Sequence, residues 1–234
     1  MPSLHELSLD ELRRHAVSTF RRGGGSRADV LLIRVDGRQA VLKDYSGADP
    51  WFRRLVGPLS VRREARALAQ LEGVPGVPRL IRTIGRQALL TEYLGGASTS
   101  EKKKNKGLDP EFFARFYRLV EQIHRRGIAH CDLRSEGNIL VTPDGDPAFV
   151  DFTAHFRRPR RRNPLTRWMF ERFCQADRVA VARLKHAVWP ELLTEEERAV
   201  LARDRKTPLA RLARFFGKSI RNISRRLLTK RASR

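Results

Sequence analysis

The chain has 234 residues, with 48 Lys and Arg against 26 Asp and Glu, which gives a formal net charge of +22. Its 41% hydrophobic residues, with twelve Phe and three Trp, can form a substantial core, which excludes a wholly disordered basic protein. Because no apolar run approaches the roughly 20 residues that cross a bilayer and no signal peptide is apparent, we expect a cytoplasmic protein. The excess charge predicts attraction to nucleic acid, acidic lipid or a phosphorylated substrate.

The N-terminal part predicts a short helix and a β-hairpin. Ser8 and Glu11 have the spacing of a capping box, which predicts a helix over residues 9–16. Two β-rich runs, 30–35 and 39–43, flank Asp36-Gly37. Asp-Gly between two such runs is typical of a hairpin with a type I′ turn.

The next helix carries a carboxylate that needs a partner. The spacing over residues 61–71 is helical, and Glu64 shares a face with Leu68 and Leu71. A charge on an apolar face is unusual unless it is paired. Strand alternation puts Lys43 on one face of the second hairpin strand, together with Val41. Lys43 and Glu64 form either a functional pair or a surface ion pair, which contributes little.

The middle of the chain predicts a second strand pair, a connector and a long helix. Residues 74–78 break the preceding helix, and 79–84 and 87–94 have strand character. Residues 95–107 have the composition of a connector. Asp109-Pro110 starts a helix that ends at Gly127. Its predicted buried stripe comprises Phe112, Phe113, Phe116, Leu119, Val120 and Ile123.

The densest polar constellation lies between residues 129 and 152. Asp132, Asn138 and Asp151 surround an apolar hairpin, so we expect them to meet at strand ends. Hard oxygen ligands so arranged suit Mg²⁺ that carries a nucleotide's phosphates, with one Asp left to orient a hydroxyl. The alternative is turn chemistry, which Asx residues also favour. His130 is expected to brace this loop, with a general base as the alternative role, and Cys131 and Cys174 are expected to be partly buried apolar groups.

These elements together resemble the protein-kinase-like superfamily. Residues 40–43, Ala-Val-Leu-Lys, resemble its V-A-I-K strand; 130–132, His-Cys-Asp, resemble H-R-D; and 151–153, Asp-Phe-Thr, resemble D-F-G. The resemblance implies an α+β, two-lobed fold: a small β-rich N-lobe over 1–96, a mainly helical C-lobe over 97–204, and a basic amphipathic tail over 205–234. Within the superfamily, the residue pattern of segments 41–47, 51–64 and 74–78 looks most like that of the bacterial lipopolysaccharide-core kinases. These enzymes phosphorylate Kdo or heptose.

The resemblance implies a role for each matching residue. Lys43 would contact the phosphates of ATP and would be held by Glu64, while Asp132 would accept or orient the proton of the acceptor hydroxyl. Arg134 would offset charge on the transferred phosphate, and Asn138 and Asp151 would bind Mg²⁺. The other implied cofactor-binding residues are Gly23, Gly24, Gly25, Val41, Glu92 and Leu94.

The sequence departs from the family pattern at four places. The glycine triplet at 23–25 is not G-x-G-x-x-G, so a flexible turn is its alternative. Five residues, where the family has four, separate Asp132 from Asn138. Cys131 replaces the Arg that pairs with a phosphorylated activation loop. Thr153 replaces Gly, which makes backbone flipping less easy.

Two segments carry most of the positive charge. Residues 156–172 contain seven Arg and one Glu, and residues 207–234 contain nine Lys and Arg and no acid. The first follows Asp151 directly, where the family's acceptor binds, so it favours an anionic substrate. The second has apolar residues at helical spacing, which fits a helix on an anionic membrane, a helix packed on the C-lobe or, less well, a nucleic-acid contact. These residues are Leu209, Leu212, Phe216, Ile220, Ile223 and Leu227.

The sequence therefore predicts an ATP- and Mg²⁺-dependent phosphotransferase with an alcohol group as acceptor. We expect it to act on an anionic sugar or glycolipid, such as lipopolysaccharide core, at the cytoplasmic membrane face. The alternatives are a protein Ser/Thr kinase and a catalytically silent pseudokinase that binds membrane, nucleic acid or a partner protein. The oligomeric state stays open.

Overall fold

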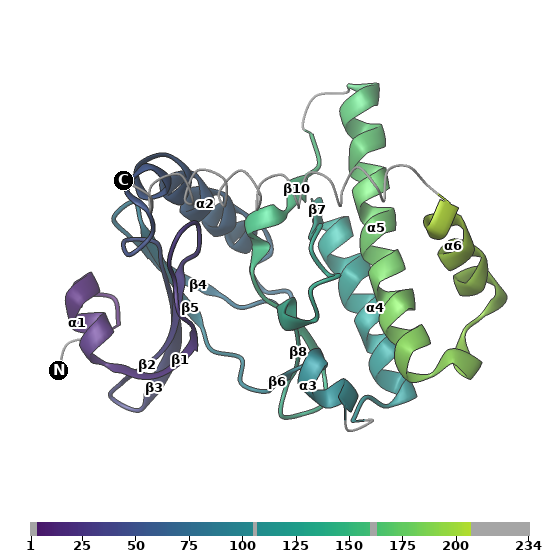
Figure 1. Cartoon of the computed structure of the whole chain (residues 1–234), viewed down its shortest axis with the longest axis horizontal. Coiled ribbons are helices and arrows are strands. Elements are labelled where there is room, and N and C mark those ends of the chain that lie inside the picture. Colours follow the sequence, from purple (N-terminus) through teal and green to yellow (C-terminus); the bar gives the residue numbers. More distant parts are fainter. Residues whose placement is uncertain (1–3, 105–106, 160–162, 207–234) are drawn as a thin grey trace, which may run out of the picture.

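The computed structural model describes residues 4–104, 107–159 and 163–206. It combines a small antiparallel sheet with helices, which is the mixed content expected of a kinase-like domain. In Figure 1 the sheet lies on the left and the long C-terminal helices lie on the right. Residues 207–234 of the predicted tail, 205–234, lie outside the described residues, and the boundaries at 96 and 204 stay predictions.

The sheet has five antiparallel strands in the order β1-β2-β3-β5-β4. β2 and β3 form the predicted hairpin, in which Val35 pairs with Arg38. Asp36 and Gly37 have φ values of 47° and 74°, as a type I′ turn requires. β1 was not predicted, because its residues are mostly exposed and show no apolar alternation. The strands are β1 (Ala16–Arg21), β2 (Asp29–Val35), β3 (Arg38–Asp44), β4 (Leu80–Ile84) and β5 (Ala88–Glu92).

Helix α1 (Leu9–Arg14) packs against one face of this sheet. Both reciprocal hydrogen bonds of the Ser8–Glu11 capping box are present, so the predicted helix start is confirmed. Leu12 is fully buried and belongs to one apolar cluster with Ala40 and Leu42 of β3. Because side chains alternate along a strand, burying Ala40 and Leu42 here directs Lys43 to the opposite face, as predicted.

Helix α2 (Pro50–Gln70) begins earlier than the sequence predicted. Its first half contains Pro58, a residue that normally ends or kinks a helix, and the predicted helical spacing began only at Val61. Glu64 and Leu68 are both buried on its inner face, as predicted. The helix ends before residues 74–78, and β4 and β5 follow as the predicted strand pair.

The predicted connector, 95–107, contains two short elements that the sequence did not predict, β6 (Ala97–Ser98) and α3 (Thr99–Lys104). β6 pairs with β8 (Ile139–Val141). Gly96 has a φ of 82°, and a Cβ at this position would collide with the carbonyl oxygen of Val141. The chain can therefore pass this close to β8 only because residue 96 is glycine.

The helical part confirms the predicted long helix and hairpin. The side chain of Asp109 accepts the Phe112 N–H at the start of α4, and every residue of the predicted stripe is buried. β8 pairs with β9, and β10 pairs with β7 beside the start of α5. None of the described helices is both long and apolar enough to cross a membrane. The elements are α4 (Pro110–Arg125), β7 (Ile128–Ala129), β9 (Pro147–Phe149), β10 (Phe156–Arg157), α5 (Pro164–Val188) and α6 (Glu195–Lys206).

Candidate active site

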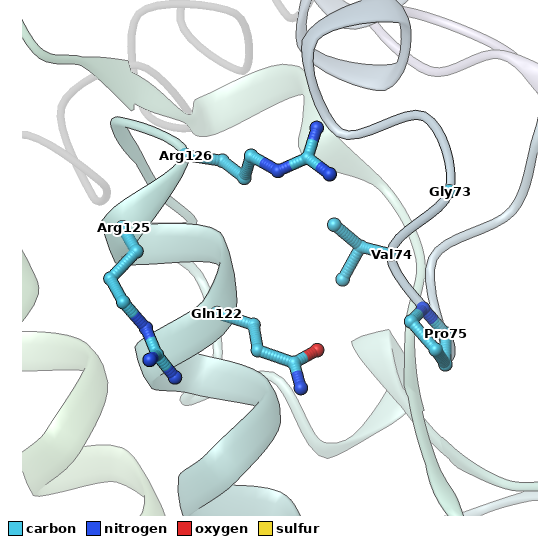
Figure 2. A pocket seen from close by; sticks show the side chains of 6 residues that line it. All are labelled: Gly73, Val74, Pro75, Gln122, Arg125 and Arg126. Atoms are coloured by element: carbon cyan, nitrogen blue, oxygen red, sulfur yellow. The ribbon is translucent and has the colours of Figure 1, made fainter.

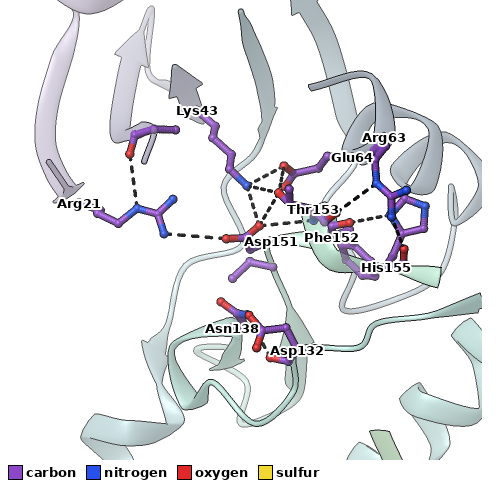
Figure 3. Close-up of polar contacts among 12 residues, drawn as sticks. Arg21, Lys43, Arg63, Glu64, Asp132, Asn138, Asp151, Phe152, Thr153 and His155 are labelled. Atoms are coloured by element: carbon purple, nitrogen blue, oxygen red, sulfur yellow. Dashed lines mark hydrogen bonds and ion pairs between the residues drawn. The ribbon is translucent and has the colours of Figure 1, made fainter. Parts of the chain in front are cut away.

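Lys43 lies at the centre of a buried ionic network (Figure 3). Its Nζ lies 2.6 Å from Oε2 of Glu64 on α2 and 2.7 Å from Oδ1 of Asp151, which follows β9. Lys43 is 7% exposed and Glu64 is 4% exposed, so the pair is not a surface ion pair. Burial alone would lower the pKa of Lys43, but the two carboxylates raise it above its ordinary value, so the amine stays charged.

Thr153 completes this network with its hydroxyl group. Its Oγ1 accepts a hydrogen bond from Lys43 Nζ at 2.9 Å and lies 2.7 Å from Oδ1 of Asp151 and 2.9 Å from Oε2 of Glu64. A hydroxyl has one proton, so it donates to one of the two carboxylates at a time. The Thr153 side chain therefore links Lys43 of β3, Glu64 of α2 and Asp151 of the segment after β9.

Asp151 is held in an uncommon backbone conformation, with a φ of 64°. Burial alone would raise the pKa of its carboxyl group, but Lys43 and the Thr153 hydroxyl hold it well below its usual range. Arg21, at the end of β1, adds to this effect because its Nη1 lies 3.9 Å from Oδ2 of Asp151. Arg21 was missed because its strand was not predicted. The one hint in the sequence was its position two residues before the glycine triplet.

Asp132 and Asn138 form a second pair, below Asp151 in Figure 3. Asn138 Nδ2 donates to Oδ2 of Asp132 at 2.9 Å and to its backbone oxygen at 3.1 Å. Because the amide nitrogen is turned toward Asp132, the amide oxygen is left as the end that can act as a metal ligand. Asn138 ends a short 3-10 helix, Glu136–Asn138, which lies in the part of the loop that is one residue longer than the family pattern.

The Asp132 loop is braced from inside the protein. The N–H groups of His130 and Cys131 donate to the carboxylate of Asp177 on α5, at 2.7 and 2.9 Å. His130 Nδ1 accepts the Asp132 N–H at 3.4 Å, so Nε2 carries the proton and donates to the Val150 carbonyl at 3.1 Å. His130 is fully buried, as its predicted bracing role requires. Asp177 was missed, although an acid amid the apolar residues of a helix was a visible signal.

Neither cysteine has the properties of a nucleophile. Burial raises the pKa of Cys131 above its ordinary value and that of Cys174 to about 12, so both thiols stay protonated at neutral pH. Both side chains pack in the apolar cluster around Phe170, as predicted.

Arg63 of α2 fixes the segment that follows Asp151. Its Nη2 donates to the carbonyl oxygen of His155 at 2.6 Å, and its Nε donates to that of Thr153 at 3.5 Å. The same helix therefore holds this segment through both Glu64 and Arg63.

Several predicted site residues lie outside the ionic network. The N–H of Gly23 donates to Asp29 at 2.7 Å and that of Gly24 to Arg27 at 3.2 Å, so the triplet forms a closed turn in this structure. The Arg134 guanidinium donates to Asp204 on α6 at 3.1 Å. Roles at the phosphates for the triplet and for Arg134 stay predictions.

The residues predicted to surround the adenine lie on the sheet. Val41 is half-buried on β3, and Glu92 ends β5, with Leu94 two residues further on. The Glu92 N–H donates to the Arg79 carbonyl at 2.9 Å, so this N–H is already engaged within the protein.

The donor set fits Mg²⁺ only in part. Within residues 4–104, 107–159 and 163–206, no group of three or more His, Cys, Asp and Glu side chains is gathered to hold a metal ion. Asp151 and Asn138 offer a carboxylate and an amide oxygen, which are hard ligands of the type that Mg²⁺ prefers. Phosphate oxygens of a nucleotide would have to complete the coordination.

A separate pocket lies between the turn after α2 and the end of α4 (Figure 2). It contains no residue of the Lys43 network or of the Asp132 loop. Its lining residues are Gly73, Val74, Pro75, Gln122, Arg125 and Arg126.

A strand lysine paired with a helix glutamate, a loop with Asp and Asn, and a further Asp beside the lysine define a kinase-like protein, active or silent. Residues 61–185 match the ABC1 atypical kinase-like domain. This match spans more than half of the chain, so the protein belongs to that family. The matched range includes Glu64, Asp132, Asn138 and Asp151, and Lys43 lies before it. A search of curated proteins gave no match.

Proposed function

We propose that the protein is an ATP- and Mg²⁺-dependent phosphotransferase that acts on an anionic sugar or glycolipid at the cytoplasmic membrane face. The observation that carries the phosphotransfer is the contact of Lys43 with both Glu64, at 2.6 Å, and Asp151, at 2.7 Å. Kinases need these residues in place together to act on ATP.

In this proposal the sheet and the helical part act as the two lobes of a kinase. Lys43 binds the nucleotide's phosphates from β3, and Glu64 keeps its amine oriented. The backbone at Glu92 and Leu94 meets the adenine, with Val41 over its ring. Asn138 and Asp151 would hold Mg²⁺, which supplies positive charge to the phosphates when bound. Asp132 accepts the proton of the acceptor hydroxyl, and Asn138 fixes the orientation of its carboxylate through the 2.9 Å hydrogen bond.

The substrate class is inferred from charge. Arg157 and Arg158 follow the active-site segment directly, and Arg167 and Arg172 lie on the first turns of α5. Such a concentration of positive charge favours an anionic acceptor, since it raises the local concentration of substrates with the opposite charge. Lipopolysaccharide core is the acceptor that the resemblance to Kdo and heptose kinases favours. We further propose that the basic tail over 205–234 holds the protein at an anionic membrane.

A silent pseudokinase is the second candidate, and one observation favours it. The carboxylate of Asp151 already contacts Lys43, and Arg21 lies 3.9 Å from its other oxygen. Two cationic side chains therefore compete with a metal ion for this carboxylate. Such a protein would bind a membrane, a nucleic acid or a partner protein without transferring phosphate.

Labelled ATP tests the proposal. The protein is incubated with γ-labelled ATP, Mg²⁺ and fractionated lysate, and label is counted separately in lipid-linked sugar and in protein. We expect label in the glycolipid fraction and a fall of roughly 10² to 10⁴ in rate for Asp132→Asn. Asp144→Asn, at an exposed turn, is the matched control and should act like the wild type.

Each other outcome identifies an alternative. Label in protein would identify a protein Ser/Thr kinase. Absence of transfer in every fraction would favour the pseudokinase, and an unchanged rate in Asp132→Asn would contradict the assigned role of Asp132.

A further inference from the structure

One face of α2 is exposed and apolar over its first half. Trp51, Leu55 and Leu59 follow one another at intervals of four residues and are 45%, 71% and 57% exposed. Residues at this spacing lie on one face of a helix, and the next positions along this face are Arg62 and Arg66, both exposed. We call these five residues the α2 stripe. The buried residues of α2 lie mainly on its other side, although the Trp51 ring lies edge-on to that of buried Phe52, with centroids 5.6 Å apart.

The start of α5 has the same character. Leu165 and Trp168 are 63% and 49% exposed, and the neighbouring Arg167 side chain is 80% exposed. The Arg172 guanidinium lies over the Trp168 ring, 5.5 Å from its centre. Five of the eight large apolar residues that are exposed in the described part of the chain belong to the α2 stripe or to this turn. Single exposed apolar side chains are ordinary, whereas such grouping marks interaction surfaces.

Helix α2 lies beside the segment that follows Asp151, and the start of α5 comes shortly after that segment in the sequence. Arg63, next to Arg62 of the stripe, donates to the carbonyl of His155, and β10 leads from there toward α5. In Figure 1, α2 and the first turns of α5 both lie along the upper side of the molecule.

We propose that the α2 stripe and the start of α5 bind the surface of an anionic lipid bilayer. Trp and Leu side chains enter the boundary between headgroups and acyl chains, while arginines beside them reach the lipid phosphates. The charge of the stripe fits such a partner, because the one acid on α2, Glu64, is buried against Lys43. Each basic side chain near an anionic bilayer adds to the attraction.

Two other partners fit this surface less well. A nucleic acid would engage the arginines, but it offers no apolar phase to Leu55, which is 71% exposed. Residues 207–234 of the chain itself carry nine basic residues and no acid, so packing them on the stripe would bring like charges together. The bilayer is the partner that satisfies both the leucines and the arginines.

The inference rests on the proposed function only for its purpose, which is to present a glycolipid acceptor to the site. Binding to a bilayer needs no phosphotransfer, so it is tested without ATP. Failure of the vesicle assay then leaves the phosphotransfer proposal untouched, and failure of phosphotransfer leaves this inference untouched.

The test uses the full-length chain and vesicles of phosphatidylcholine with or without phosphatidylglycerol, separated by sedimentation. We expect binding to the anionic vesicles and at least about tenfold weaker binding for Leu55→Glu/Leu59→Glu, since two apolar side chains are lost and two negative charges are added. Leu192→Glu, which changes a leucine that is 42% exposed outside both segments, is the matched control and should bind like the wild type. Equal binding by the double variant and the wild type would overturn the inference.

Tryptophan fluorescence gives a second measurement that does not depend on a charge change. Brominated lipids should quench the wild type on anionic vesicles. They should leave Trp51→Phe/Trp168→Phe unquenched, because its remaining Trp189 is partly buried and donates to the Leu108 carbonyl at 2.8 Å. Vesicle binding without quenching of the wild type would mean that another segment makes the contact, and it would overturn the inference.

Discussion

Thr153 shows how much of the candidate site depends on one hydroxyl group. Sequence comparison with D-F-G identified this position only as a loss of backbone freedom. In the structure its Oγ1 lies within 3 Å of Lys43, Glu64 and Asp151, so the side chain contributes more than the backbone effect. This role was not visible in the sequence, because nothing in Asp-Phe-Thr shows that the third side chain reaches Lys43 and Glu64.

Replacing Thr153 tests that role. Thr153→Val keeps the shape of the side chain and removes the hydroxyl, so buried charges lose a hydrogen-bonding partner. We expect the free energy of unfolding, measured with urea, to fall by about 1–3 kcal/mol. Thr153→Ser restores the hydroxyl and should recover most of this loss. Equal losses in both variants would show that packing of the methyl group, and not the hydroxyl, is what matters.

Asp151 predicts a pH dependence of stability. Its pKa in the folded protein lies well below the value of about 3.9 expected in the unfolded chain. The carboxylate therefore stabilises the fold above about pH 4, and this contribution is lost as the pH falls through the folded pKa. The difference in free energy of unfolding between the wild type and Asp151→Asn should shrink as the pH is lowered below about 4. Urea titrations at several pH values measure it, with Asp144→Asn as control, and a constant difference would contradict the assignment.

At the scale of elements, the sequence predicted structure where local chemistry decides it. The Asp36-Gly37 turn, the Ser8–Glu11 box and α4 were all predicted, since the signal for each lies within a few neighbouring residues. β1 was not predicted because its residues are mostly exposed and show no apolar alternation, and the first half of α2 was not predicted because Pro58 interrupts it. These segments are set by neighbours that are distant in sequence: β1 pairs along β2, and α2 packs on the segment after Asp151.

Two glycines with similar backbone conformations should differ in how much stability the protein loses when each is replaced by alanine. Gly96 and Gly73 have similar φ values, 82° and 78°, but only at Gly96 would a Cβ meet backbone atoms. Gly73→Ala should cost about 1–2 kcal/mol, the strain of a left-handed conformation. Gly96→Ala carries the same strain plus a collision with the Val141 carbonyl, so it should unfold at a lower urea concentration than Gly73→Ala. Equal midpoints would contradict the close approach.

At the scale of the whole molecule, a few polar contacts tie the sheet and α2 to the helical part. Lys43 joins β3 to Asp151, Arg63 joins α2 to His155, and the Phe149 N–H donates to the Gly76 carbonyl at 2.8 Å. The order of the site residues along the chain allowed Lys43, Glu64 and Asp151 to be predicted as a group. Arg21 and Asp177 could not be chosen in this way, since their partners are 130 and about 47 positions away in sequence and no motif links them. The contacts of Lys43 with Glu64 and Asp151 were thus predictable from the sequence, and those of Arg21 and Asp177 were not.

The same contacts predict that nucleotide binding stabilises the whole fold. Lys43 and Asp151 come from the two sides of the site, so a ligand that engages both resists their separation. A ligand at 100 times its dissociation constant adds about 2.7 kcal/mol to the free energy of unfolding. For a chain of this length that corresponds to a rise of roughly 5–11 °C in Tm.

We expect this rise with Mg-ATP in a thermal melt and little of it for Lys43→Met, when the Tm of each variant is compared with its own value without ligand. Removing Mg²⁺ with EDTA should reduce the rise, because Asp151 then lacks the ion that links it to the phosphates. A wild type that shows no shift at millimolar Mg-ATP would contradict nucleotide binding and favour a silent module in which Lys43 serves only to join Glu64 to Asp151.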